Sequence, residues 1–177
     1  WLKVHELPEA SRTARGQHVK ALLALSADED VSAVLSLKAF DDETYVFMAT
    51  ARGVVKKVST SAFSNAKTRG IIAIRLDAGD KLIRSYLTHG DDHVILTSRL
   101  GRTLRFAEDQ VRPMGRASRG VKRFRLSSCD ALASALCIYP DEQMLFISEY
   151  GYGKRIDYVQ FAAHGRGTGG QIGYKVN

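Results

Sequence analysis

A glycine preceded by a basic residue recurs along the chain at a nearly constant spacing. The dipeptides are Arg15-Gly16, Arg69-Gly70 and Arg119-Gly120, and Gly169-Gly170 stands at the fourth position without its base. The steps between the glycines are 54, 50 and 50 residues. A period of this size is typical of chains built as arrays of small sheets, such as the blades of a β-propeller. The sequence therefore predicts repeated sheets, with a basic group at the same place in each.

Each repeat carries four short apolar or alternating segments bounded by turn residues, which predicts four strands. The first strands follow the repeated glycine, at 71–76, 121–126 and 171–176. The second strands are expected at 31–37, 82–87 and 131–138. The third, at 45–50, 94–98 and 144–148, are apolar runs typical of strands covered on both faces. The fourth lie at 54–59, 102–106 and 152–156, after tight loops that contain Gly53, Gly101 and Gly151.

These segments predict an all-β fold, an array of four-stranded antiparallel blades that repeat every 50 residues or so. We expect one partial domain over 1–177, with repeat units at 31–76, 82–126 and 131–176 and the end of a truncated blade at 1–25. No stretch of helical length holds a 3.6-residue period. A β-sandwich with accidental self-similarity is the alternative fold.

The composition, 45% apolar and 25% charged, is that of a folded protein. No apolar run reaches the length of a membrane span, and residues 1–6 do not resemble a signal peptide, so we expect a cytoplasmic protein without membrane contact. The chain opens abruptly in a predicted strand, which indicates a fragment of something longer. The net charge is +7, and the first fifty residues hold more acids than bases, so the basic surplus lies beyond them.

The bases gather on the fourth strands and in the loops before the repeated glycine. Arginine and lysine meet phosphate oxygens, and a neighbouring glycine lets backbone N–H groups approach, so we predict a curved surface that binds double-stranded DNA. Without a recognition helix to read base edges, binding would rest on phosphate contact and DNA bending. The predicted phosphate contacts are Arg12, Arg15, Arg52, Lys56, Lys57, Lys67, Arg69, Arg102, Arg105, Arg112, Arg116, Arg119, Lys122, Arg123, Lys154, Arg155 and Arg166. Among them Lys57, Arg105 and Arg155 occupy one repeated position on the fourth strands.

No catalytic or metal-binding set emerges from the sequence. Gly151-Tyr152-Gly153-Lys154-Arg155 lacks the spacing and the following helix of a phosphate-binding Walker loop. We therefore expect no catalysis and no cofactor in this domain.

Several strings resemble the C-terminal domain of bacterial DNA gyrase A. They are Leu7–Gln17, Phe47–Thr50, Gly53–Lys57, Val111–Arg116 and Gly151–Arg155, and the resemblance extends over essentially the whole chain. It implies a β-pinwheel, a propeller-like disc of six blades with strands exchanged between neighbours. It also implies that the basic rim of the disc wraps DNA in support of ATP-dependent negative supercoiling. The cleavage tyrosine, the ATPase and the use of ATP and Mg would lie elsewhere in the parent enzyme, in the rest of gyrase A and in gyrase B.

The family's gyrase-box motif is absent from these residues, and it would belong to a blade before Trp1. The corresponding domain of topoisomerase IV, with a weaker wrap, is therefore the second interpretation. A propeller-type scaffold for protein interactions is the alternative from another class, and a propeller enzyme is a third. The resemblance implies a bacterial cytoplasm, in association with the nucleoid.

Overall fold

Three β-hairpins follow one another in the computed structural model, which describes residues 1–23, 25–65 and 70–176. They are β1–β2 (Tyr45–Thr50 and Val54–Ser59), β4–β5 (His93–Ser98 and Arg102–Ala107) and β8–β9 (Gln143–Ile147 and Gly153–Asp157). All three are antiparallel. Their turns contain Gly53, Gly101 and Gly151 at φ of 75°, 75° and 82°, which confirms the expected left-handed loop glycines.

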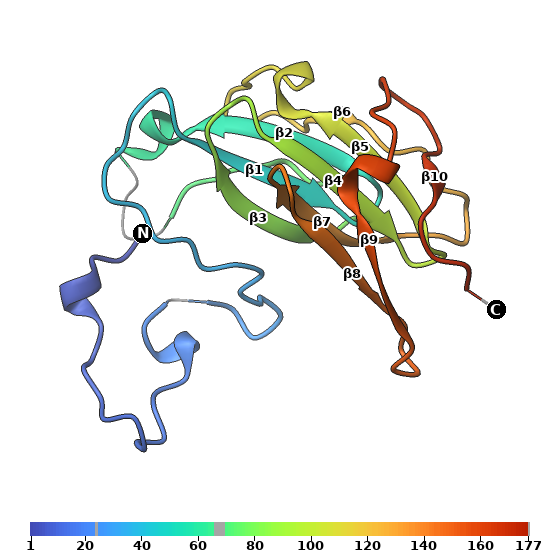
Figure 1. Cartoon of the computed structure of the whole chain (residues 1–177). Helices are drawn as coiled ribbons and strands as arrows, with labels where there is room; N and C mark the ends of the chain where they lie inside the picture. The colour runs from blue at the N-terminus through green and yellow to red at the C-terminus, as the bar shows by residue number, and fades with distance from the viewer. Residues whose placement is uncertain (24, 66–69, 177) are drawn as a thin grey trace.

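The outer strands of the two four-stranded sheets come from the next repeat (Figure 1). β3 (Leu82–Thr88) pairs with β1, and β7 (Leu132–Ile138) pairs with β4 in the same way. On the other side, β6 (Val121–Lys122) pairs with β2 and β10 (Gln171–Ile172) pairs with β5. The sheet orders are β3-β1-β2-β6 and β10-β5-β4-β7, and β8-β9 is a two-stranded sheet. The predicted class, an all-β array of antiparallel four-stranded sheets, is confirmed.

Two predicted strands are wrong. Residues 31–37 and 71–76 are irregular, and of the expected strands at 121–126 and 171–176 only two residues each pair in a sheet. The reason is the exchange of strands between repeats. β3 and β7 both pair with the hairpin of the preceding repeat, and the described residues contain no hairpin before 31–37 with which it could pair. A segment without ladder partners does not hold strand conformation.

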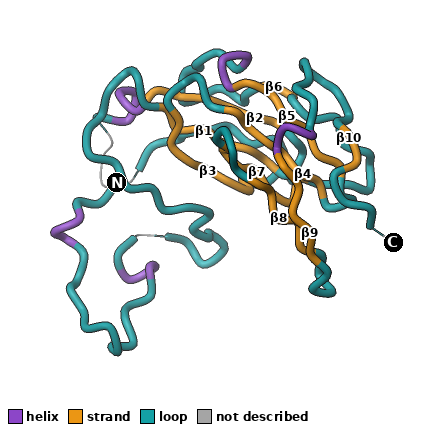
Figure 2. Tube along the Cα trace, viewed as in Figure 1, coloured by secondary structure: helices purple, strands orange, loops and turns teal. Residues whose placement is uncertain are grey.

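Loop structure dominates the N-terminal part of the chain. The described residues before β1 form two short 3₁₀ turns, η1 (Val4–Glu6) and η2 (Val19–Ala21), and are otherwise irregular (Figure 2). The ring centroid of Trp1 lies 4.8 Å from that of Phe40 and 5.8 Å from that of Phe63, so the start of the chain packs on η3 (Thr60–Phe63), the 3₁₀ turn that follows β2. In the part of the chain that the structure describes, no helix could span a membrane.

The hydrophobic core lies between successive sheets. The ring centroid of Phe47 on β1 lies 5.3 Å from that of Tyr86 on β3 and 6.4 Å from that of Phe106 on β5. One cluster therefore joins both four-stranded sheets. A second cluster, with Ile95 and Phe146, joins the second sheet to β8–β9. β4 is buried on both faces because it lies between the first sheet and β8–β9. β1 is also buried on both faces, because irregular residues such as Leu35 and Ile71 cover the face that points away from the second sheet.

The repeated glycine marks a close approach between backbones. Gly120 has a φ of 95°, and a Cβ atom there would lie 2.5 Å from the Val55 carbonyl oxygen of β2. Gly170 has a φ of 59°, and its Cβ would overlap the Thr103 carbonyl oxygen of β5. Both glycines precede the short strands β6 and β10. At Gly120 and Gly170 the repeated glycine therefore lies where a repeat joins the hairpin before it.

We expect Gly120→Ala to destabilise the chain more than Gly16→Ala. Both glycines have a positive φ, which costs alanine about 1–2 kcal/mol. At Gly16 none of the described atoms lies within 4 Å of the added methyl, whereas at Gly120 it meets backbone. Urea denaturation of the two variants measures the difference, and equal losses would contradict the close approach as the cause of the repeat.

Candidate nucleic-acid interface

The predicted phosphate-binding bases divide by the exposure of their side chains. Arg12, Arg15, Arg52, Arg112, Arg119, Lys122, Lys154, Arg155 and Arg166 are exposed. Arg102, Arg105 and Arg116 are half-buried, and Lys56, Lys57 and Arg123 are buried. Lys67 and Arg69 lie outside the described residues.

Lys57 of β2 is a structural cation. Its side chain is 4% exposed, and its Nζ lies 3.3 Å from Oε1 of Glu108, whose side chain is fully buried. Glu108 opens η4 (Glu108–Gln110) and also accepts hydrogen bonds from Thr88 Oγ1 at 2.6 Å and Gly90 N at 3.2 Å. The ion pair thus joins β2, β3 and η4. The prediction that Lys57 binds phosphate is wrong for this conformation, because phosphate cannot reach its ammonium.

Arg105 holds the same position in the second sheet, with a different partner. Tyr158 stands where Glu108 stands in the first, and the guanidinium carbon of Arg105 lies 4.5 Å over its ring. Nη1 of Arg105 donates to the Phe161 carbonyl at 3.1 Å. Arg155, the third member, is exposed. The repeated column on the fourth strands therefore joins neighbouring repeats at two of its three positions, and these contacts explain its repetition without phosphate.

Lys56 and Arg123 are enclosed as well, which removes them from the surface that can meet phosphate. Nζ of Lys56 donates to the carbonyls of Ala73 at 2.7 Å, Ser118 at 3.0 Å and Arg116. Burial lowers the pKa of Lys56 to about 8. The guanidinium of Arg123 lies 4.2 Å over the Phe106 ring and donates to Gln110 and to the carbonyl of His164. Burial also lowers the pKa of Arg123.

Arg102 binds the loop that contains the fourth glycine pair. Its Nε donates to the Gly169 carbonyl at 2.5 Å and its Nη2 to the Gly170 carbonyl at 2.7 Å. These hydrogen bonds tie the start of β5 to the loop that leads into β10. Arg102 is therefore largely occupied by protein, and it is a weaker candidate for phosphate than the exposed arginines.

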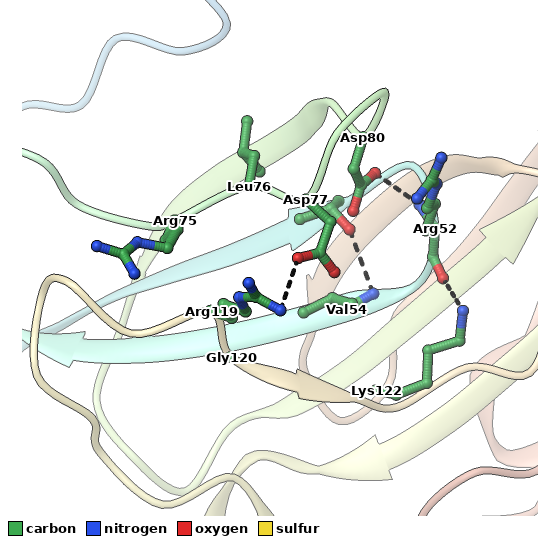
Figure 3. Close-up of a pocket in the computed structure, with 10 residues that line it drawn as sticks. Arg52, Val54, Arg75, Leu76, Asp77, Asp80, Arg119, Gly120 and Lys122 are labelled. Carbon is green, nitrogen blue, oxygen red and sulfur yellow. Dashed lines mark hydrogen bonds and ion pairs between the residues drawn. The ribbon is translucent and has the colours of Figure 1, made fainter.

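A basic recess of about 390 Å³ lies where the first hairpin turn meets the Arg119-Gly120 loop (Figure 3). Its charged lining residues are Arg52, Arg75, Arg119, Lys122, Asp77 and Asp80. Asp80 is structural, since its Oδ1 accepts the backbone N–H of Arg52 at 3.0 Å and of Lys81 at 2.8 Å. Asp77 pairs with Arg119, Oδ1 to Nη1, at 3.2 Å on the surface. The four cations exceed the two carboxylates, so the recess can accept an anion.

Arg75 lies in this recess but is missing from the predicted set, although the sequence contains a signal for it. Arg75, Arg125 and Lys175 occupy one repeated position after the glycine of each repeat, and all three are exposed. The backbone N–H of Arg75 donates to the Ser118 carbonyl at 3.0 Å, and that of Arg125 to the Thr168 carbonyl at 2.9 Å. The repeat thus places an exposed base beside each basic loop.

The basic loops run along equivalent sheet edges. Met114 N donates to the Lys57 carbonyl at 2.8 Å, and Pro113 bridges to Lys57, so loop 112–120 follows the edge of β2. His164 N donates to the Arg105 carbonyl at 2.8 Å, and Ala163 bridges to Arg105, so loop 162–170 follows β5. The exposed bases at these edges and in the recess form what we call the basic track. They are Arg52, Arg75, Arg112, Arg119, Lys122 and Arg166.

Hairpins that exchange strands with their neighbours, with basic loops on the edges of successive sheets, define a propeller-like β-pinwheel module. A family model described as "DNA gyrase C-terminal domain, beta-propeller" matches residues 1–38, 44–86, 92–138 and 142–177. The chain belongs to this family. The second break in the match begins at the end of β3 and the third follows β7, and both strands pair with the preceding hairpin.

The curated relatives of this chain include DNA gyrase A proteins, in agreement with the family model. The DNA gyrase A protein of Salmonella typhimurium strain LT2 is 42% identical over 176 residues, 99% of this chain and 20% of the relative. The DNA gyrase A protein of Escherichia coli strain K12 is 41% identical over 175 residues, with the same coverage. The chain therefore spans about a fifth of the length of the curated relatives it matches.

Solved structures show the same architecture. The C-terminal domain of DNA topoisomerase IV superposes with a TM-score of 0.88 at 26% identity, over 96% of this chain and 53% of that one. The DNA gyrase A C-terminal domain gives a TM-score of 0.76, also at 26% identity, over 89% of this chain and 52% of that one. The chain therefore corresponds to about half of such a domain.

Lys57→Met is expected to destabilise the chain by about 3–5 kcal/mol, because it leaves the buried Glu108 carboxylate without a cation. Lys154→Met is the matched control, since Lys154 lies on β9 and is exposed. Urea denaturation measures both variants, and the double variant Lys57→Met/Glu108→Gln should recover part of the loss. A Lys57→Met variant as stable as the Lys154→Met control would contradict a structural ion pair.

The free energy of unfolding should gain a contribution from Lys56 as the pH rises from 8 to 10.5. In that window the unfolded chain keeps the proton on Lys56 that the folded chain has lost, so higher pH favours folding. Burial raises the pKa of Cys137 to about 12 and acts in the opposite sense, so the test is a difference between variants. The free energy of unfolding of the wild type minus that of Lys56→Leu should increase across this window when both are measured by urea denaturation. A difference that stays constant with pH would contradict the lowered pKa of Lys56.

Proposed function

We propose that this chain is a DNA-binding and DNA-wrapping part of DNA gyrase A. The observation that carries the proposal is the repetition of basic loops on equivalent edges of successive sheets. A surface that repeats its positive charge once per sheet suits a polymer that repeats its negative charge along its length. The family membership and the gyrase A relatives support the same assignment.

Binding would rest on phosphate contacts rather than on base edges. The basic track presents arginine and lysine, and the described residues contain no α-helix that could enter the major groove. Bending a site of about 20–30 base pairs costs on the order of 1–6 kcal/mol, which several phosphate contacts would offset. Because the loops that carry the track lie on the edges of successive sheets, we expect DNA that follows them to curve.

The wrap would support ATP-dependent negative supercoiling by the whole enzyme. We propose that double-stranded DNA, the rest of gyrase A and gyrase B are the partners, in the bacterial cytoplasm. DNA cleavage and ATP use, with its Mg, would belong to those other parts, and this domain would hold no cofactor of its own. The relatives extend well beyond this chain, so these activities concern the parent protein.

The corresponding domain of topoisomerase IV is the second candidate, and the TM-score of 0.88 with such a domain favours it. The gyrase A proteins of Salmonella typhimurium and Escherichia coli are 42% and 41% identical over 99% of this chain, so gyrase is the first choice. Sequencing the residues upstream of Trp1 distinguishes the two, because a gyrase-box motif there would select gyrase. A protein-interaction scaffold would instead bind a protein partner in the presence of excess competitor DNA.

The affinity of the chain for duplex DNA should fall steeply with salt, with little preference for sequence. Each phosphate contact contributes a slope of about −0.9 to log affinity against log salt. Arg119→Ala and Lys122→Ala should each flatten the slope by about that amount. Fluorescence anisotropy with a labelled duplex measures it, and Arg84→Ala, an exposed base outside the track, is the control. An unchanged slope in both track variants would contradict the assignment of the recess.

Asp77→Asn should raise the affinity for DNA. The carboxylate of Asp77 holds Arg119 in a surface ion pair and repels phosphate from the recess. Its removal frees Arg119 at little cost in stability, so we expect a gain of a few-fold at low salt that disappears at high salt. The same anisotropy titration measures it, and weaker binding would show that the ion pair holds Arg119 in its binding position.

A further inference from the structure

We propose that Lys56 is a positioning residue for the basic track, since its buried ammonium holds the loop that carries Arg112, Arg116 and Arg119. This inference rests on the proposed DNA-binding function. Lys56 itself touches no DNA, because its side chain has no exposed surface.

The ammonium of Lys56 joins two segments that are otherwise distant in sequence. Its three N–H groups match three carbonyl oxygens, those of Ala73 at 2.7 Å, Ser118 at 3.0 Å and Arg116. The Ser118 carbonyl also accepts the backbone N–H of Arg75 at 3.0 Å. One buried cation thus fixes the backbone beside Arg75 and the backbone on both sides of Ala117. All of these positions lie close to exposed bases of the track.

The next repeat shows that the fold does not require a lysine at this position. Leu104 of β5 occupies the equivalent place and is also fully buried. There the loop is held by the backbone N–H of Gly167, which donates to the Arg123 carbonyl at 3.1 Å, and by arginine side chains from the segment that follows β6. Arg123 donates to the His164 carbonyl at 3.0 Å and Arg125 to the Gly167 carbonyl at 2.9 Å. The equivalent carbonyl in the first repeat is that of Ala73, and it accepts from Lys56 instead. The lysine therefore replaces a backbone contact in one loop, the loop with the most arginines.

The choice of carbonyl partners has an electrostatic consequence. Lys57 is neutralised by Glu108, whereas the acceptors of Lys56 are dipoles without net charge. The charged groups on the segments packed against Lys56 are Arg75, Arg112, Arg116, Arg119, Lys122 and Asp77. Five of these six are cations, so a carboxylate partner would reduce the potential that attracts phosphate. Carbonyl acceptors fix the loop without placing a carboxylate beside the basic track.

Salt titration separates a positioning residue from a contact. If loop 112–119 opens when Lys56 is removed, DNA binding must first select the closed loop, and the affinity falls by the closed fraction. Lys56→Leu should therefore weaken binding about three- to tenfold at every salt concentration, with the slope unchanged. Lys56→Arg keeps the charge and the donors and should recover most of the affinity. Arg112→Ala removes a proposed phosphate contact and should instead make the slope less negative by about 0.9.

The loop can also be followed without DNA. Trypsin should cleave after Arg116 and Arg119 faster in Lys56→Leu than in wild type. Urea denaturation shows whether the variant is folded. If Lys56→Leu does not fold, Lys56→Met takes its place in both measurements. Faster cleavage with weaker binding at constant slope supports the inference. The inference is overturned by unchanged cleavage, by unchanged affinity for DNA, or by a salt slope that becomes less negative by about one. Wild-type chain that fails to bind DNA overturns the proposed function, while the cleavage result still judges the role of Lys56 in holding the loop.

Discussion

The exchange of strands between neighbouring repeats is the constraint on which the rest of this structure depends. The hairpins β1–β2 and β4–β5 each supply only the two central strands of a sheet, and the strands outside them come from further along the chain. A two-stranded hairpin alone is marginally stable in water, so no repeat can fold independently of the next. The same exchange gathers Phe47, Tyr86 and Phe106 from two repeats into one core, and it requires glycine where backbones meet at Gly120 and Gly170.

The backbones of the basic loops take part in this exchange of strands. In the proposed function, the side chains of the same loops bind DNA. Loop 112–120 bridges to β2 and leads into β6, which completes the sheet, while Arg112 and Arg119 face solvent. Within this one loop, the backbone contributes to the sheet, and the exposed arginine side chains are available for DNA in the proposed function. The inward bases Lys56, Lys57 and Arg123 hold repeats together through carbonyls, a carboxylate and an aromatic ring. The outward bases form the basic track.

Much of the fold could be predicted from the sequence, because hairpins and glycine turns are local features. The strands at 45–50 and 54–59 and the loop glycines agree with the structure. The strand expected at 31–37 fails, because strand conformation there depends on a distant acceptor. The burial of Lys57 could not be predicted either. Its position on β2 is the same as that of exposed Arg155 on β9, and the difference is Glu108, 51 residues further along the chain.

The central claim is that the basic track bends DNA, and the end-to-end distance of a bound duplex tests it most directly. A duplex of about 30 base pairs with a donor and an acceptor dye at its ends should show energy transfer that rises as the chain binds. The rise should vanish at high salt and should be smaller for the Arg112→Ala/Arg119→Ala variant at equal occupancy. If the chain saturates the duplex and the duplex ends stay as far apart as in free DNA, the basic track does not bend DNA.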